Sequence, residues 1–276
     1  MRRLALLTLT FLMLACKEHP PQYNGYIDAD LTYLSSNFAG RLDSLLVLRG
    51  QAVKKNELLF KLEQTTEYDG VAISQFNTKN LQAQRRQIIS QIQYVETNYQ
   101  RTSRMRKQDA ASQNDLDLAK KDLDVLKSQL NAIDFQIKSS RVDIANKKWQ
   151  VERKESYAPD AGMIFDTYFT KNEYVQPGQP VLSLITKEHI KVIFFVPEAE
   201  LSHIHLKEKV KLSTDGNPTF AKGTISYIAK IAQYTPPIIY SREDRQKLVF
   251  RVEARLNNPN LQEIHLGQPI SLEFIR

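Results

Sequence analysis

The chain has 276 residues, a formal net charge of +7 and a single cysteine. Its basic residues are interleaved with acidic ones and form no Arg- or Lys-rich block with aromatic residues, which argues against a nucleic-acid-binding protein. One cysteine also excludes a disulfide within one chain.

The N-terminus has the features of a secretory signal peptide. The pair Arg2-Arg3 precedes an apolar run from Leu4 to Leu14, which is too short to span a bilayer. The run ends in Met-Leu-Ala-Cys, with Cys16 last, and this sequence resembles a bacterial lipobox. We therefore expect Cys16 to be lipidated; a chance cysteine in an ordinary signal peptide is the alternative.

Two segments further along look like halves of one β-module. The first runs from Asn37 to Leu62 and the second from Pro159 to Leu184, and they align without a gap. Glycine and apolar positions coincide: Gly40 with Gly162, Leu42 with Ile164, Val53 with Val175, Leu59 with Val181, and Leu62 with Leu184. Because each half lacks a closed core, the halves must meet, and the segment between them must leave and return side by side.

The segment between the halves is predicted to form two long antiparallel helices. Residues 66–106 contain no proline and one glycine, in the first turn, and residues 114–155 contain neither. Apolar stripes at 3–4 spacing run along both: Leu81, Ile88, Ile92, Val95, Tyr99 and Thr102 in the first, and Leu116, Ala119, Leu123, Leu126, Leu130, Ile133, Ile137, Ser140, Ile144 and Val151 in the second. One narrow stripe per helix is a coiled-coil seam, so we expect a projecting hairpin of roughly 60 Å rather than a bundle folded back on the β-domains.

The C-terminal third is predicted to be a compact β-barrel. Short strands are expected at 189–196, 210–213, 223–228, 248–256 and 270–274, with a helical turn after Pro197-Glu198. The segment from Gly25 to Leu34 is a candidate for a further barrel strand.

This order of elements resembles the HlyD-type membrane fusion proteins, the periplasmic adaptor proteins of export pumps. Three local motifs agree with the resemblance: Val175-Gln176-Pro177-Gly178 with the family's V-x-x-G turn, Val196-Pro197-Glu198 with its V-P-E opening of the barrel helix, and Leu266-Gly267-Gln268-Pro269-Ile270 with its closing motif, where Gln268 replaces the usual methionine.

The resemblance implies an α+β fold: a split lipoyl-like β-module with an inserted long antiparallel coiled-coil hairpin, followed by a small β-barrel. The expected division is a signal peptide at 1–15, a lipidated tether at 16–23, a first barrel strand and first lipoyl half at 24–64, the helical hairpin at 65–156, the second lipoyl half at 157–186, and the β-barrel domain at 187–276.

The turn of the predicted hairpin carries the most specific match. Adaptors that dock on TolC-type channels carry Arg, then Leu four residues on, then Ser seven further, and Arg101, Met105 and Ser112 have this spacing. Asp115 follows in the family's pattern, and Met for Leu conserves volume. The resemblance makes these four residues the channel-docking tip. A solvated helix face for Arg101 and an N-cap for Ser112 are the alternatives, and Ser112 can serve both roles.

By the same resemblance, the protein is a non-catalytic periplasmic adaptor in a Gram-negative bacterium. It would link an inner-membrane transporter to a TolC-like outer-membrane channel, assemble as a hexamer, and be held by the lipid on Cys16, with the inner membrane favoured. The chain ends where the barrel should close, and residues 232–237 with Arg245 resemble adaptors found with ABC-type exporters. These features favour an ABC-type exporter and leave a proton-driven one open.

Other functions find little support. A biotin- or lipoate-carrying domain needs a modifiable lysine in the turn that the hairpin replaces here. His203 and His205, with His189 nearby in sequence, lack a reason to bind metal and read as exposed barrel residues. We expect no cofactor and no catalytic residue. The remaining alternative is a free-standing coiled-coil envelope lipoprotein, which explains Cys16 and the heptads but not the split repeat or the tip.

Overall fold

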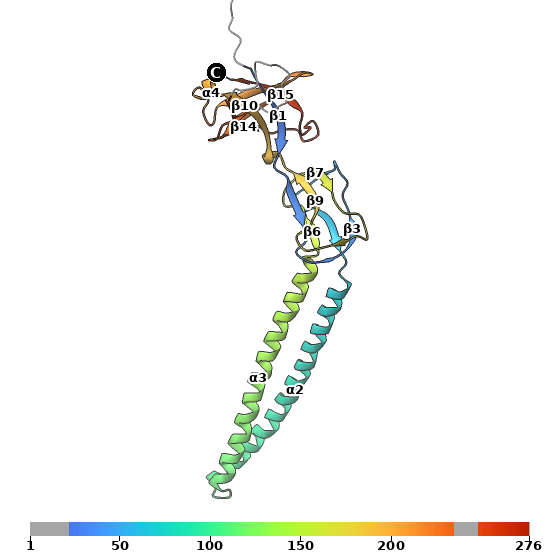
Figure 1. Cartoon of the computed structure of the whole chain (residues 1–276). Helices are drawn as coiled ribbons and strands as arrows, with labels where there is room; N and C mark the ends of the chain where they lie inside the picture. The colour runs from blue at the N-terminus through green and yellow to red at the C-terminus, as the bar shows by residue number, and fades with distance from the viewer. Residues whose placement is uncertain (1–21, 235–247, 276) are drawn as a thin grey trace, which may run out of the picture.

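The structure is a computed structural model that describes residues 22–234 and 248–275. Figure 1 shows a β-barrel, a β-module and a helical hairpin following one another in a row. The predicted fold class is thereby confirmed. The signal peptide and Cys16 lie outside the described residues, as do Arg245 and residues 235–237 of the stretch compared with ABC-type adaptors.

The two half-modules interlock to form the lipoyl-like module. The first half supplies β3 (Gly40–Leu45), β4 (Ala52–Val53) and β5 (Leu58–Leu62), and the second supplies β7 (Gly162–Thr167), β8 (Tyr174–Val175) and β9 (Pro180–Ile185). With β2 (Thr32–Ser35) and β6 (Glu155–Tyr157), they form two four-stranded sheets ordered β2-β9-β7-β4 and β6-β5-β3-β8. Val53 pairs with Gly162 and Val175 with Gly40, so each half gives its short strand to the other.

The repeat appears in the core and in the turns of this module. The aligned residues Leu42 and Ile164 are both fully buried in its apolar core. Positive φ angles also recur at aligned positions. Gly50 matches Asn172 (φ 80° and 75°), and Asn56 matches Gly178 (φ 62° and 80°). Only Gly and Asn occupy these positions because other side chains clash in the left-handed region.

The barrel forms a separate core. Its strands are β1 (Gln22–Ala29), β10 (Ile190–Pro197), β11 (Lys209–Thr214), β12 (Asn217–Ile228), β13 (Gln233–Tyr234), β14 (Leu248–Leu256) and β15 (Pro269–Phe274). The ring runs β10-β1-β15-β11-β12-β14 and closes where β14 pairs with β10; β13 adds to β14. A short 3-10 helix, η1 (Lys187–His189), precedes β10, and α4 (Glu198–Leu201) follows it.

The N-terminal strand differs from the prediction in two ways. The segment from Gly25 to Leu34 splits, because β1 pairs with β10 and β15 of the barrel whereas β2 pairs with β9 of the lipoyl-like module. The predicted tether also ends earlier, since Gln22 and Tyr23 belong to β1. Tyr23 is buried, and its ring packs against the rings of Phe194 and Phe274 at centroid distances of 6.1 and 5.6 Å.

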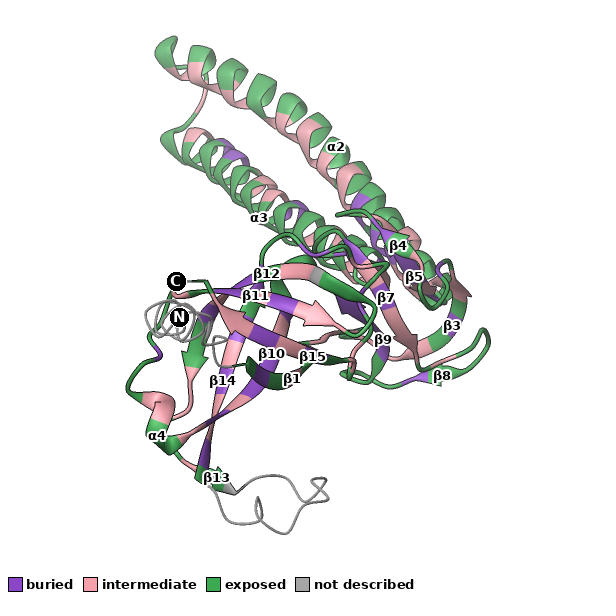
Figure 2. Ribbon diagram, turned by 90° about the horizontal axis from the view of Figure 1, so that it is seen from above, coloured by how far each residue is buried: buried purple, intermediate pink, exposed green. Residues whose placement is uncertain are grey.

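The inserted hairpin consists of α2 (Thr65–Lys107) and α3 (Gln113–Glu152), of 43 and 40 residues. The fully buried positions of α3 all belong to the predicted stripe: Ala119, Leu123, Ile133, Ile137 and Val151. Figure 2 shows that burial follows the facing sides of the two helices and that their far sides are exposed. Within the described ranges, no helix has both the length and the apolar character needed to cross a membrane.

The seam of α2 begins nearer the root than predicted and is polar there. Ser74 and Thr78 are buried in it. Thr78 Oγ1 lies 2.6 Å from the Ser140 hydroxyl, and the Ser74 hydroxyl donates to Asp143 at 2.6 Å. The next polar layer is an ion pair in which Arg85 Nε donates to Asp134 at 2.6 Å. Such layers fix the register of two helices, because a shift would leave these groups unpaired.

Candidate functional site

The hairpin tip is built by the end of α2 and a tight turn. The N–H groups of Gln108 and Ala110 both donate to the carbonyl of Met105, at 3.0 and 2.9 Å. Asp109 has a φ of 54°, which lets the chain reverse immediately after Lys107. Asp and Asn tolerate this conformation better than most residues. The turn therefore brings the last turn of α2 beside the first turn of α3.

Ser112 and Asp115 form a capping box at the start of α3. The Ser112 hydroxyl accepts from the Asp115 N–H at 3.1 Å, and the Asp115 carboxylate accepts from the Ser112 N–H at 3.0 Å. The carboxylate also accepts from the Ser112 hydroxyl at 2.6 Å, and these hydrogen bonds hold the pKa of Asp115 below its ordinary value. The N-cap role of Ser112 is confirmed.

Arg101 and Met105 are the accessible members of the predicted tip. They are four residues apart on α2, so they lie on one face of its last two turns. Met105 is 41% exposed. Arg101 is exposed and makes no ion pair with any described residue, whereas Arg106 pairs with Asp109 at 2.9 Å. The tip thus presents an apolar side chain and an unpaired guanidinium, with the capping box next to them.

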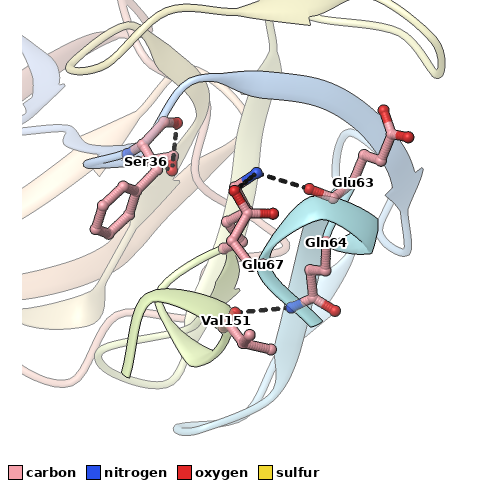
Figure 3. Close-up of polar contacts among 7 residues, drawn as sticks. Ser36, Glu63, Gln64, Glu67 and Val151 are labelled. Carbon is pink, nitrogen blue, oxygen red and sulfur yellow. Dashed lines mark hydrogen bonds and ion pairs between the residues drawn. The ribbon is translucent and has the colours of Figure 1, made fainter. Parts of the chain in front are cut away.

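A second arrangement, at the hairpin root, was not anticipated from the sequence. Lys154 is 7% exposed, and its ammonium donates to the Glu63 carbonyl at 2.8 Å and pairs with the Glu67 carboxylate at 2.7 Å. In Figure 3, Glu63 and Glu67 lie at the start of α2, where these contacts converge. The buried ammonium joins the end of α3 to the beginning of α2.

Further contacts hold the root in place. Figure 3 shows the Gln64 amide donating to the Val151 carbonyl, at 2.8 Å, which links the two helices again. The Phe38 ring meets the Trp149 ring edge to face at 5.8 Å, so a loop of the lipoyl-like module also packs on α3. Charged residues at the end of a solvated helix are expected from the sequence to be exposed. The sequence around Lys154 gives no sign that it pairs with Glu67.

The strands that flank the insertion carry an ion pair. Lys61 on β5 donates to Glu155 on β6 at 2.6 Å, and the Tyr157 hydroxyl donates to the same carboxylate at 2.5 Å. The hydrogen bond from Lys61 and then that from Tyr157 hold the pKa of Glu155 below its usual range. The hydrogen bond to Glu155 raises the pKa of Lys61.

The described residues hold no group of three or more His, Cys, Asp or Glu side chains placed to bind a metal ion. Of the histidines noted in the sequence, His205 lies 3.3 Å from Glu208, and His203 donates its backbone N–H to the Glu200 carbonyl.

Proteins of similar sequence include bacterial UPF0194 membrane proteins, and no family model matches the chain. A UPF0194 membrane protein of Acidithiobacillus ferridurans is 29% identical over 119 residues, which span 43% of this chain and 35% of that protein. A UPF0194 membrane protein of Enterobacter sp. (strain 638) is 23% identical over 289 residues, which span 91% of this chain and 87% of the relative.

Solved structures of membrane fusion and adaptor proteins share the fold. MacA from Actinobacillus actinomycetemcomitans superposes with a TM-score of 0.74 at 17% identity, covering 93% of this chain and 79% of MacA. The membrane fusion protein Spr0693 from Streptococcus pneumoniae R6 gives 0.61 at 12% identity, covering 92% and 98%. The periplasmic adaptor protein EmrA gives 0.50 at 15% identity, covering 92% and 99%. The resemblance to membrane fusion proteins is therefore confirmed in the fold.

Proposed function

We propose that this protein is a non-catalytic periplasmic adaptor of the HlyD type, which links an inner-membrane transporter to a TolC-like outer-membrane channel for efflux or secretion. The observation that carries the proposal is the hairpin. Two helices of 43 and 40 residues leave a split β-module and end in a tip with an exposed Met105 and an exposed Arg101, which has no ion-pair partner among the described residues. A rigid rod with free polar and apolar groups at its far end suits a protein that bridges two partners.

The chemistry of the tip fits docking against the helical ends of a channel. Met105 is an unbranched, adaptable apolar side chain that can fill a gap between partner helices. Arg101 offers several N–H donors in a planar fork, which suits carboxylates and backbone carbonyls. Ser112 and Asp115 satisfy each other, so their proposed contribution is a rigid turn that fixes where Arg101 and Met105 point.

The proposal extends to assembly and anchoring. The adaptor would form a ring, with six copies as the proposed number, and work with an ABC-type exporter in a Gram-negative bacterium. Lipid on Cys16 would hold it to the inner membrane, and the mass of the mature N-terminus tests this anchor: an unmodified Cys16 would exclude it. The tether would begin there and lead into β1, whose first residue is Gln22.

Export by tip variants tests the proposal. In a strain that lacks the native protein, we expect Arg101→Glu or Met105→Asp to abolish efflux of a panel of dyes and antibiotics. Unfolding temperatures should stay nearly unchanged, because exposed residues usually contribute less than about 0.5 kcal/mol. A reversed charge or a charge in an apolar hole costs several kcal/mol at an interface.

Leu130→Asp in the helix seam is the matched control. It should lower both stability and export, because it places a charge in the coiled-coil core. Normal efflux with both tip variants would contradict docking by the tip and would favour the free-standing envelope lipoprotein instead.

A further inference from the structure

The two hairpin helices use an acidic side chain at the same helical position in different ways. Asp115 is the third residue of α3, and its carboxylate accepts from the Ser112 N–H at 3.0 Å, as in a capping box. Glu67 is the third residue of α2, where the N-cap residue Gln64 makes no side-chain capping bond. The Glu67 carboxylate instead pairs with Lys154 at 2.7 Å. A carboxylate at a capping position of α2 thus binds a residue far away in the sequence.

The main chain of Lys154 belongs to the lipoyl-like module. Lys154 follows the end of α3 and precedes β6, and its carbonyl accepts from the Leu62 N–H on β5 at 2.9 Å. Its ammonium lies beside β3, since a Cβ added at Gly40 would be 3.5 Å from Nζ. From there it donates to the Glu63 carbonyl at 2.8 Å and reaches Glu67. The side chain therefore connects the module to the first turn of α2, where Figure 3 shows Glu63 and Glu67.

This ion pair is largely shielded from water. The Lys154 side chain is 8% exposed and the Glu67 side chain 22%. Among the described residues, Lys154 is the only cation paired with Glu67, and Glu67 Oε2 is buried with no hydrogen-bond partner. A buried pair adds little net stability, but separating its members is strongly unfavourable because a buried charge is left uncompensated. The pair therefore opposes any movement of α2 away from the module.

The end of α3 is held to the module by a different contact. The Phe38 ring meets the Trp149 ring at 5.8 Å, and the Arg153 guanidinium lies 5.3 Å from the centre of the Trp149 ring. No aromatic pair of the described residues involves the first turns of α2. The Gln64 amide donates to the Val151 carbonyl, which joins α2 to α3 but not to the module. The direction of α2 thus depends on the buried ion pair.

We propose that Lys154 is a positioning residue for the hairpin tip. Its ammonium holds the first turn of α2 against the lipoyl-like module and so sets the direction of the hairpin. Because the hairpin is roughly 60 Å long, a swing of about 15° at its root would displace the tip by about 16 Å. The direction of the hairpin is a property of the isolated chain, whereas its importance for docking rests on the proposed function.

Distances between spin labels test the proposal in the isolated full-length protein. Cys16→Ala removes the native thiol. One nitroxide label is placed on α2 with Asn80→Cys, and the other on the module with Asp43→Cys or Lys171→Cys, all at exposed positions. Asn80 lies about 22 Å along α2 from its start, so the same swing moves it by about 6 Å. Two reference positions on the module register movement in different directions.

Lys154→Met and Glu67→Ala each remove one member of the buried pair, and Lys55→Met is the matched control. Lys55 pairs with Asp160 at 3.0 Å on the surface of the same module, where both side chains are 63% exposed. We expect narrow distance distributions in the native protein and with Lys55→Met. Lys154→Met and Glu67→Ala should broaden or shift them by about 6 Å. Alanine suits a helix, so Glu67→Ala decides the test if Lys154→Met does not fold, as judged by circular dichroism.

Two results would overturn the positioning role. One is an unchanged distribution with Glu67→Ala, and the other is equal broadening with Lys55→Met. The consequence for docking is measured separately: Glu67→Ala should lower dye efflux although Arg101 and Met105 are unchanged. Full efflux by a variant with broadened distances would contradict the need for a fixed hairpin direction. It would leave docking by the tip itself to the variants at positions 101 and 105.

Discussion

Ser112 shows how one residue of the tip can be explained by local structure alone. Its hydroxyl accepts from the Asp115 N–H, and the Asp115 carboxylate accepts in return from the Ser112 N–H. These bonds satisfy N–H groups that the first turn of α3 would otherwise leave without partners. A purely structural role is therefore enough to explain Ser112 in the spacing of Arg101, Met105 and Ser112. Of the four predicted tip residues, only Arg101 and Met105 have side-chain groups available to a partner protein.

Replacing Ser112 separates the two roles. Ser112→Ala should lower the free energy of unfolding by about 1 kcal/mol, because the helix loses its N-cap. Ser112→Asp should recover most of that loss, since Asp is an equally good N-cap residue. Chemical denaturation of the two variants measures both effects. Equal destabilisation by Ala and Asp would contradict the capping role.

Stability should fall on both sides of neutral pH. The pKa of Glu155 is lowered by Lys61, and that of Asp115 is lowered by Ser112. The stabilisation of the folded state by these two carboxylates is therefore present above the ordinary carboxyl pKa and is lost as pH falls below about 4. The pKa of Lys61 is raised, so its contribution is present below the ordinary lysine pKa and is lost as pH rises above about 10.4.

Urea unfolding at pH 3.5, 7 and 11 measures this profile. A variant with both Lys61→Met and Glu155→Gln lacks the ion pair. Its free energy of unfolding should fall less between pH 7 and 11 than that of the native protein. If the variant and the native protein lose equal stability there, Lys61 is not the group responsible.

At the scale of elements, the hairpin was the most predictable part of the fold. Its seam follows from a 3–4 spacing of apolar residues. This spacing can be recognised in the sequence without knowledge of the rest of the molecule. The root end of the α2 seam was missed because Ser74, Thr78 and Arg85 are polar, and a polar residue in a sequence gives no sign of a partner on the other helix. The lipoyl-like halves were predictable because the repeat aligns their core positions.

Other features depend on pairings that sequence patterns do not contain. The split of residues 25–34 between two sheets is set by hydrogen bonding to β10 and to β9, strands more than 140 residues away. The root contact between Lys154 and Glu67 likewise joins residues 87 positions apart. Both features follow from tertiary packing, which overrides local preference.

The seam gives a prediction for the hairpin as an element. Ile137 is 5% exposed, so Ile137→Ala should cost about 2–4 kcal/mol through the lost burial and the cavity it leaves. Ser139→Ala, two residues on and exposed, should stay within about 0.5 kcal/mol. Thermal unfolding followed by circular dichroism measures both. Equal effects would mean that α3 does not pack against α2 through this seam.

At the scale of the whole molecule, the barrel, the lipoyl-like module and the hairpin follow one another in a row. The barrel and the lipoyl-like module have separate cores, and the root contacts of Lys154, Gln64 and Trp149 fix the direction in which the hairpin leaves the module. A hairpin of roughly 60 Å then carries the tip away from the β-domains. The exposed Arg101 and Met105 at its far end suit a protein that meets another protein at its tip.

The most direct test of channel docking is site-specific photo-crosslinking in living cells, with a benzophenone side chain introduced at position 105. We expect position 105 to capture an outer-membrane channel protein, identified by mass spectrometry. Capture of only this chain from position 105, with the transporter and channel both present, would contradict the proposal that the tip docks on a channel.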